Sequence, residues 1–252
     1  MGGGIGEIMN DTLKTIQQLR SIRSFIDKPL KDEELDTIVN ASIRAANSSA
    51  RQCYSIVVLK DQQKMQAIFG YQGAAALVYC VDYNRIQDIA THLGEVNLMS
   101  APIDFITGST DAVLAAQTAV IAAKSMGIDS LITNGVHRKD LNTIQELLQL
   151  PKQYCYPLIA VVLGYSEVEV DHVKERIVKG VIHQEIYHRL TAEEIEEEIE
   201  TFDQNDKKYG LTTYTQWKTM GFKHYYQWFF QKWIGRQEDK FSPALRTVKF
   251  LD

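Results

Sequence analysis

The stretch STDAVLAAQTAVIAAKSMGI, residues 109–128, lies near the middle of a chain of 252 residues. It begins with residues that cap helices and ends at Gly127, and glycine is the usual residue just past a helix C-terminus. Apolar residues occupy almost every side of this helix, which is typical of a helix inside a protein rather than on its surface. The stretch therefore predicts a central, buried helix whose alanines allow close contacts.

Short apolar runs lie on both sides of this helix in the sequence, and most of them are nearly continuous rather than alternating. That pattern predicts strands covered on both faces. Amphipathic runs between them predict further helices. Because helices and strands mix without a regular βαβ alternation, the fold class is α+β. The predicted strands are 55–61, 74–83, 129–133 and 156–165, and the predicted helices around them are 11–20, 32–46, 139–150 and, in an acidic stretch, 191–206.

The composition limits the classes of function. A net charge of −5 gives no overall preference for nucleic acid or for a membrane surface, so any basic cluster must act locally. Cys53, Cys80 and Cys155 are widely spaced and odd in number, which argues against a disulfide scaffold or a structural zinc site. The N-terminus has no signal-peptide pattern, and the apolar run 112–123 is shorter than a membrane span. We expect a soluble, cytoplasmic protein.

Two clusters of cationic residues are candidates for anion binding. Arg20, Ser21 and Arg23 follow the first predicted helix. They either complement the negative end of that helix or offer the forked donors that match phosphate oxygens. Lys174 and Arg176 would point the same way in an extended segment. They are either solvated surface charges or the further cations that a dianionic phosphate needs.

Two polar loops are candidates for contacting a planar ligand. Asn47, Ser48, Ser49 and Gln52 lie between a helix and a strand, and they suit either turn hydrogen bonds or recognition of a heteroaromatic edge. Thr133, Asn134 and Gly135 end a predicted strand, where they form a turn or expose backbone N–H groups to a ligand. The sequence contains no GxGxxG, GxxxxGK[ST], HExxH or GxSxG motif.

The chain changes in character after residue 171. The spacing of His183, Glu185 and His188 does not align them on one helical face, so we predict no metal site. The C-terminal aromatic residues either stack on a planar ligand or, more commonly, anchor helix packing or a subunit interface. They are Tyr214, Trp217, Phe222, Tyr225, Tyr226, Trp228, Phe229, Phe230 and Trp233.

A family resemblance connects these pieces. LRSIRSFIDKPLKDEELDTIVNASIRAANSSARQCYSIVVLKD, residues 19–61, resembles the opening of the FMN-dependent nitroreductase and flavin reductase family, most closely its oxygen-insensitive NADPH nitroreductase branch. The similarity resumes in AVLAAQTAVIAAKSMGI, ITNGV, LLQLPKQYCYPLIAVVLGYSE and VKERI, and it covers about residues 10–205.

This resemblance implies a three-layer sandwich, with a mostly antiparallel sheet between helices, in an intertwined homodimer with FMN at two interface sites. Residues 1–205 would form the FMN-binding domain, and 206–252 an aromatic-rich extension that we expect to wrap the partner. By the resemblance, Arg20, Ser21 and Arg23 bind the phosphate together with Lys174 and Arg176. Asn47, Ser48, Ser49 and Gln52 approach the flavin from the other subunit, Gln72 bonds the polar edge of the ring, and Thr133, Asn134 and Gly135 lie beside its N5.

The activity implied by the resemblance is hydride transfer from NAD(P)H, through bound FMN, to an electron-poor acceptor in ping-pong order. The acceptor would be a nitroaromatic, a quinone or free flavin, and no side chain is assigned as acid or base. The sequence departs from close relatives at Leu19, where they have histidine, and in 210–222, which lacks their arginine-rich loop for the NADPH 2′-phosphate. The alternatives are a flavin-binding sensor or storage protein without turnover, and a dimeric interaction module.

Overall fold

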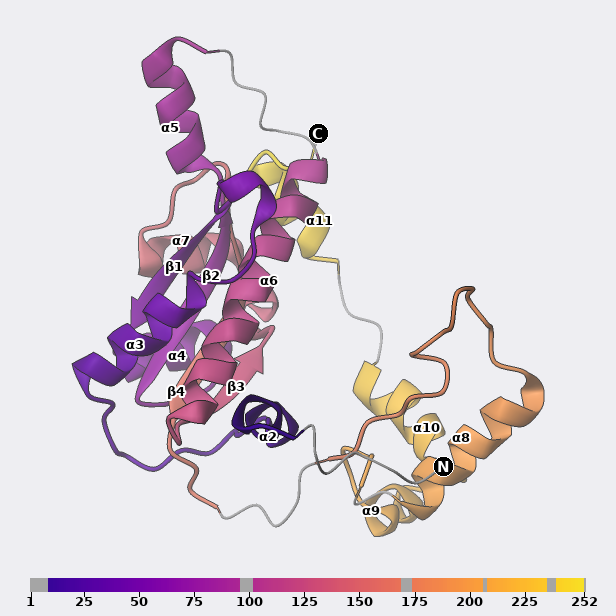
Figure 1. Ribbon diagram of the computed structural model, residues 1–252. Helices are drawn as coiled ribbons and strands as arrows, with labels where there is room; N and C mark the ends of the chain where they lie inside the picture. Colours follow the sequence, from indigo (N-terminus) through magenta and orange to yellow (C-terminus); the bar gives the residue numbers. More distant parts are fainter. Residues whose placement is uncertain (1–8, 96–101, 169–173, 206–207, 235–238, 252) are drawn as a thin grey trace. The chain divides into compact units, whose positions relative to one another are not determined.

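The computed structural model describes residues 9–95, 102–168, 174–205, 208–234 and 239–251 (Figure 1). The chain forms two compact units, one of residues 1–169 with 239–252 and the other of residues 170–238. The predicted boundary between an FMN-binding domain and an extension, near residue 205, stays a prediction.

A four-stranded antiparallel sheet forms the centre of the first unit. Its strands are β1 (Tyr54–Leu59), β2 (Ala75–Asp82), β3 (Asp129–Thr133) and β4 (Cys155–Gly164), in the order β1-β2-β4-β3. The two middle strands are the most apolar, and almost all of their residues are buried, as their continuous apolar sequence predicts. The predicted mixed α+β class with an antiparallel sheet is therefore confirmed.

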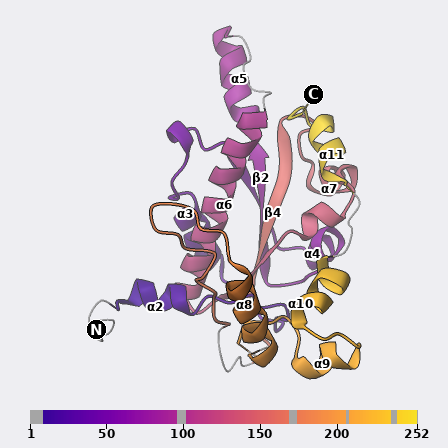
Figure 2. The same cartoon turned by 90° about the vertical axis from the view of Figure 1, so that its right-hand side faces the viewer.

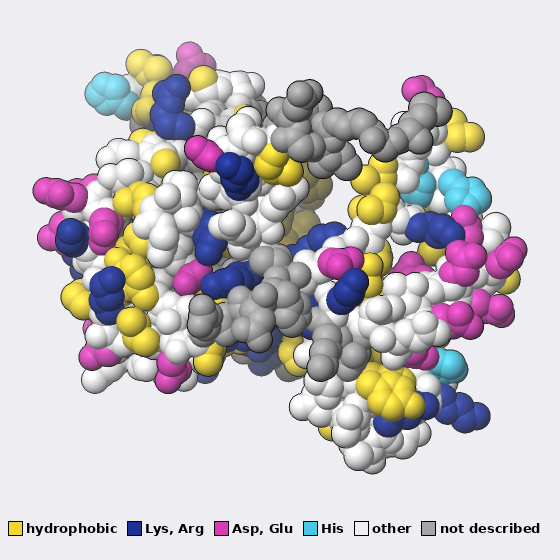
Figure 3. Space-filling model, turned by 60° about the horizontal axis from the view of Figure 1, so that its bottom comes forward, with side chains coloured by type: hydrophobic (Ala, Val, Ile, Leu, Met, Phe, Trp, Pro, Cys, Tyr) yellow, Lys and Arg dark blue, Asp and Glu magenta, His cyan; other side chains and the backbone are white. Residues whose placement is uncertain are grey.

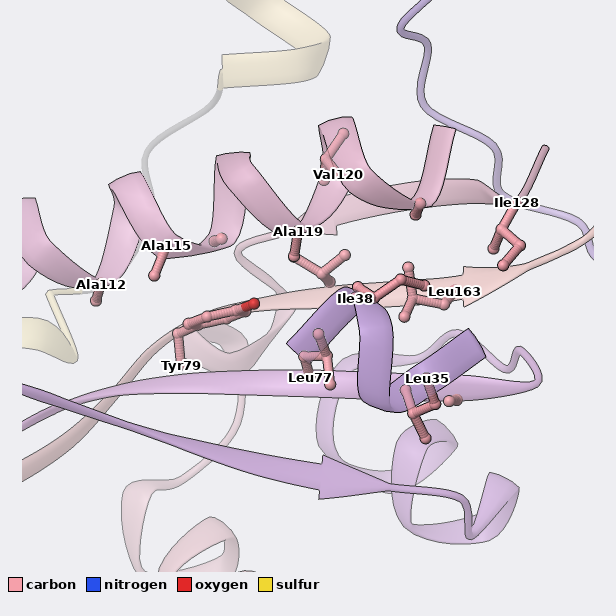
Figure 4. Close-up of a cluster of buried hydrophobic side chains, with 14 of the residues drawn as sticks. Leu35, Ile38, Leu77, Tyr79, Ala112, Ala115, Ala119, Val120, Ile128 and Leu163 are labelled. Atoms are coloured by element: carbon pink, nitrogen blue, oxygen red, sulfur yellow. The ribbon is translucent and has the colours of Figure 1, made fainter. Parts of the chain in front are cut away.

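Helices cover both faces of this sheet (Figure 2). On one face, α3 (Asp32–Ser42) and α6 (Pro102–Ser125) pack against side chains of β2 and β4, with Ile38 and Ala119 in the same cluster as Leu77 and Leu163 (Figure 4). On the other face, α4 (Gln62–Phe69) and α7 (Leu141–Leu148) pack around Val78 and Val162. The helices α2 (Asp11–Gln17) and α5 (Asn84–Leu93) complete this half of the chain.

The helix α6 differs from its prediction in two ways. It begins at Pro102 and has 24 residues, so the expectation that its apolar run is too short for a membrane span is wrong on length. Among the helices described, it is the one long and apolar enough to cross a bilayer by length and composition. It is also not buried all round, because its alanine face lies on the sheet while Ile106, Val113 and Leu114 are 59%, 45% and 41% exposed.

Side-chain caps fix where several helices begin. Asp61 accepts hydrogen bonds from the backbone N–H groups of Gln63 and Lys64 at the start of α4, and Asp140 caps α7 in the same way. In α3, Asp32 is the first helical residue, and Lys31 precedes it as the cap. The Asp32 side chain bonds Lys60.

The second unit is built from α8 (Ala192–Gln204), α9 (Tyr214–Thr219), α10 (Tyr225–Trp228) and a π-helical turn, Phe229–Ile234. The helix α8 is acidic and half exposed, as predicted, and its carboxylates gather on one surface (magenta at the right of Figure 3). Most of the C-terminal aromatic residues pack these helices together, with Trp217 fully buried. Helix packing, the commoner of the two interpretations, therefore accounts for much of the aromatic density.

The last residues of the chain return to the core of the first unit. The helix α11 (Phe241–Thr247) and the turn after it bury Leu245, Val248 and Phe250 against a cluster that includes Cys53 and Tyr83. The three cysteines are buried free thiols, as predicted.

Candidate functional site

Arg20, Ser21 and Arg23 lie on an extended segment at one end of the sheet. Backbone hydrogen bonds fix this segment: the Ile22 N–H donates to the Ser130 carbonyl at 2.9 Å, and the Ile26 N–H donates to the Tyr165 carbonyl at 3.0 Å. The Ile22 side chain is buried whereas Ser21 and Arg23 are exposed, so these two point outward.

The position of this segment bears on the two interpretations of its arginines. The preceding helix, α2, ends at Gln17, and the influence of a helix dipole falls off within the last turn. Arg20 and Arg23 lie beyond that turn. The helix dipole therefore does not explain them, and binding of an anion by these residues stays a prediction.

Asp129, which sequence reasoning did not single out, organises the charges around Arg20. Its Oδ1 atom lies 3.9 Å from Arg20 Nη2 and 3.4 Å from Lys124 Nζ, and its Oδ2 accepts a hydrogen bond from the Ser166 N–H at 3.2 Å. One carboxylate thus faces two cations.

Lys174 and Arg176 belong to the second unit, where both side chains are exposed. They lie in a segment without regular secondary structure, and Arg176 Nη1 donates to the carbonyl oxygens of Lys174 and Glu175 at 3.3 and 3.4 Å. Hydrogen bonds from Lys208 and Tyr209 lower the pKa of the Glu175 carboxyl. Their partnership with the arginines of the first unit stays a prediction.

The loop of residues 47–52 has an unusual backbone. Ser49, Ala50 and Gln52 have φ angles of 54°, 56° and 51°, a left-handed conformation that costs residues other than glycine free energy. Asn47 and Ser48 use their side chains to hold this shape: Asn47 Oδ1 accepts from the Gln52 N–H at 3.3 Å, and Ser48 Oγ accepts from Arg51 Nη2 at 3.2 Å. Turn bonding thus explains these two residues, whereas Ser49 is exposed.

A buried carboxylate on α6 anchors both ends of this 47–52 loop. Asp111 is 1% exposed; its Oδ1 accepts from the Ser48 N–H at 2.8 Å, and its Oδ2 accepts from the Cys53 N–H at 3.1 Å. On the other side, Arg85 Nη2 donates to the Gln52 carbonyl at 3.0 Å. Sequence reasoning missed Asp111, although a carboxylate with only apolar, small and polar neighbours in a core helix was a usable signal.

The remaining candidates lie around β2 and β3. Gln72 is exposed just before β2, and its Nε2 donates to the Gln62 carbonyl at 3.4 Å. Gly135 follows β3 and packs so closely on α4 that an added Cβ would lie 2.7 Å from the Phe69 carbonyl oxygen. The Gly135 N–H donates to the Thr133 hydroxyl at 3.0 Å. Glycine is therefore required at this position for packing.

The strand register separates the candidates into two groups. Asp129 pairs with Gly164, and Ala75 pairs with Leu163, so the arginine segment and Gln72 lie at the same end of the sheet. The 47–52 loop precedes Tyr54, which pairs with Val81 near the other end of β2. Ala75 and Val81 are six residues apart, or about 20 Å along a strand. A single copy of the chain does not bring these two groups together.

A hollow of about 300 Å³ lies near the start of α3 and α4. Lys28, Leu30, Leu35, Lys60 and Gln62 are among the residues that line it. None of its lining residues is one of the predicted site residues, although Gln72 donates to the carbonyl of Gln62, which lines it.

Comparisons with known proteins agree with this geometry. A family model described as the nitroreductase family matches residues 16–165. The chain belongs to the nitroreductase family. The matched range includes all the candidates except Lys174 and Arg176, which lie beyond it.

Several characterised nitroreductase-family relatives are similar along most of their length. An FMN reductase (NADPH) of Bacillus subtilis is 32% identical over 211 residues, which are 80% of this chain and 84% of that protein. An NADPH-flavin oxidoreductase of Vibrio harveyi is 31% identical over 80% of this chain and 83% of its own length. A solved structure of B. megaterium NfrA2 superposes with a TM-score of 0.81 at 26% identity, covering 96% of this chain and 98% of the other.

Proposed function

We propose that this protein is an FMN-dependent oxidoreductase that uses NAD(P)H as the electron donor. The observation that carries the proposal is the segment of Arg20, Ser21 and Arg23, fixed by backbone hydrogen bonds at one end of the sheet, in a chain of the nitroreductase family whose relatives include an FMN reductase (NADPH). FMN fits this segment because its phosphate is a dianion that guanidinium groups and a serine hydroxyl bind well. When bound, FMN supplies the chemistry, accepting hydride from NAD(P)H and passing electrons to a nitroaromatic, a quinone or free flavin.

In this proposal the protein binds and orients the cofactor, and no side chain acts as acid or base. Arg20, Ser21 and Arg23 hold the phosphate, and Lys174 and Arg176 of the second unit complete its neutralisation. Gln72 bonds the polar edge of the ring, and the turn at Thr133, Asn134 and Gly135 lies beside N5. The exposed Ser49 and the half-buried Gln52 contact the ring, whereas Asn47 and Ser48 maintain the loop that carries them.

We infer that the functional unit is an intertwined homodimer with two flavin sites. The separation of about 20 Å along β2 supports this, because a second copy can supply the 47–52 loop that one copy cannot bring to its own arginines. The uncovered apolar residues of α6 support it as well, since exposed apolar patches mark interaction surfaces. The helix α5 has no buried residue, and its Ile89 and Leu93 are 51% and 68% exposed.

We expect the protein in the cytoplasm.

The role of the C-terminal aromatic residues in the dimer is a separate proposal. Deleting residues 213–252 would remove Leu245, Val248 and Phe250 from the core of the first unit, so loss of the dimer after this deletion would be uninformative. Phe230 and Trp233 are 60% and 57% exposed, and replacing both with serine is a cleaner test. Dissociation of that variant would support wrapping of the partner, and an unchanged dimer would contradict it.

The test of the function is the visible spectrum of the purified protein, recorded anaerobically before and after addition of NADH or NADPH. We expect bound flavin that is bleached by at least one donor, and the donor that acts faster is the preferred one. A protein that stays colourless after addition of FMN would refute the proposal. Flavin that binds but is bleached by neither donor would favour a sensor or storage protein instead.

A second test addresses the phosphate site directly. Replacing Arg23 and Arg176 together with alanine should weaken FMN binding at least tenfold, measured by quenching of flavin fluorescence. The matched control removes two other exposed cations, Lys139 and Arg189, and should leave FMN affinity within twofold. Equal affinities of the two double variants would contradict the predicted phosphate site.

A further inference from the structure

The buried carboxylate of Asp111 links three features of the fold. It lies on α6, and its two oxygens accept hydrogen bonds from Ser48 and Cys53, residues on either side of the strained part of the 47–52 loop. Each oxygen has a different backbone N–H as its donor, so the carboxylate spans the loop like a brace. A loop held at both ends by one rigid group has little freedom to change shape.

The backbone of the loop needs such a brace. Left-handed backbone at three residues that are not glycine is unfavourable, and it persists only where the surroundings impose it. Ser49, Ala50 and Gln52 have this conformation, and strained residues of this kind cluster at ligand sites. The strain is therefore a reason to look for what holds the loop and for what the loop contacts.

Gly108 explains how Asp111 reaches the loop. It lies one helical turn before Asp111 on the same side of α6, and an added Cβ would lie 2.9 Å from the Cys53 carbonyl oxygen. The absence of a side chain at Gly108 thus lets the helix backbone lie directly against the end of the loop. A short aspartate side chain then suffices to bond both N–H groups.

Residues of the same helical turn also face outward. Val113 lies on the side of α6 away from Asp111, whereas Leu114, three residues after Asp111, is its neighbour on the helix surface. They are 45% and 41% exposed and belong to the surface that we assign to the partner subunit. One turn of α6 therefore carries both the brace of the loop and part of the proposed dimer surface. When a partner subunit docks against α6, the helix that braces the loop therefore becomes part of the interface.

We infer that Asp111, assisted by Arg85, is a positioning residue that holds Ser49 and Gln52 of one subunit in place against the flavin of the other. This inference rests on the proposed function. Asparagine is the informative substitution at residue 111, because an amide has the shape of a carboxylate but only one accepting oxygen. Its NH2 group would face one of the two backbone donors, and the loop would lose one of its anchors.

The experiment compares Asp111→Asn with Ser42→Ala. Ser42 is the matched control because its buried hydroxyl donates to the Ala115 carbonyl, one turn further along α6, and does not contact the loop. We expect Asp111→Asn to weaken FMN binding at least tenfold and to alter the visible circular dichroism of the flavin at saturating FMN. Ser42→Ala should lower the melting temperature of the protein while FMN affinity and the flavin spectrum stay those of the wild type.

Four outcomes would overturn the inference or the function beneath it. Wild-type FMN affinity and spectrum in Asp111→Asn would overturn the inference, and so would equal losses in both variants. If Asp111→Asn does not fold, Arg85→Ala decides, because Arg85 is exposed and bonds the loop from its other side. Arg85→Ala should weaken FMN binding at least threefold, and an unchanged affinity would overturn the inference. Failure of the wild type to bind FMN would refute the proposed function itself.

Discussion

Gly108→Ala is the substitution that most directly tests how α6 is seated. An added methyl group would lie 2.6 Å from Val81 Cγ1, 2.9 Å from the Cys53 carbonyl oxygen and 3.2 Å from Tyr83 Cε2. These distances are too short for carbon, and the Cys53 oxygen is backbone that cannot rotate away. Overpacking of this kind costs about 1–3 kcal/mol.

Helix propensity acts in the opposite direction. Alanine is favoured over glycine inside a helix by about 1 kcal/mol. The two effects leave a net loss in the free energy of unfolding of up to about 2 kcal/mol, or up to about 8 °C in melting temperature for a chain of this size. Because the helix is displaced toward the outside, the brace at Asp111 should also loosen and FMN affinity should fall.

Thermal unfolding of the apoprotein, with Ser109→Ala as the control, measures this effect. Ser109 is the next residue in α6, and its half-buried hydroxyl has no hydrogen-bond partner within the described ranges. Alanine there should be neutral or stabilise the protein by about 0.5 kcal/mol, because its helix propensity is higher. If Gly108→Ala melts at a higher temperature than the wild type, close packing of α6 against the loop is not what requires glycine.

Other features of the molecule give three further tests. Burial lowers the pKa of His137, so the folded protein is stabilised above about pH 6.5, where the histidine is neutral in the unfolded chain as well, and loses stability as the pH falls toward the lower folded pKa. His137→Gln should therefore lose less resistance to urea than the wild type between pH 7.5 and 5.5, and an identical loss would refute this. Leu114→Asp on the exposed face of α6 should shift the sedimentation coefficient of the protein toward that of the monomer, whereas Gln66→Asp on the exposed side of α4 should not. A dimeric Leu114→Asp protein would contradict the proposed interface. Trp217→Ala should lower the free energy of unfolding of the second unit by about 3–5 kcal/mol and expose residues 170–238 to rapid proteolysis, whereas Trp217→Phe should not. Equal resistance of the two variants to protease would count against a core around Trp217.

The sheet could be predicted from the sequence because its signal is local. The two middle strands are continuous runs of β-branched, aromatic and alanine residues, and their predicted limits differ from the observed ones by one residue at each end. The start of α6 could not be predicted, because Gly108 and Ser109 resemble the end of a loop before a helix. Both residues lie inside the helix. Gly108 is there because the helix contacts Cys53, more than fifty residues away in the sequence, and this contact leaves no room for a side chain.

The arrangement of the candidate residues could not be predicted from the sequence. The pattern around Asn47 and Ser48 left turn bonding and ligand recognition open, and only the hydrogen bonds show that these two side chains hold the loop. The partners of Asp111 at Ser48 and Cys53, and the contact of Asp129 with Arg20, join residues far apart in the sequence, so the sequence pattern does not reveal these contacts.

In the proposed homodimer, the placement of the arginine segment and the 47–52 loop at opposite ends of one sheet has a genetic consequence. If replacing Arg23 and replacing Gln52 each inactivate the protein, the two variants should restore activity to each other when co-expressed. In a mixed pair, one site inherits both defects and the other inherits neither, so random pairing would leave about a quarter of all sites intact. Recovery of activity from two dead alleles would thus be a direct sign that the site is shared between chains.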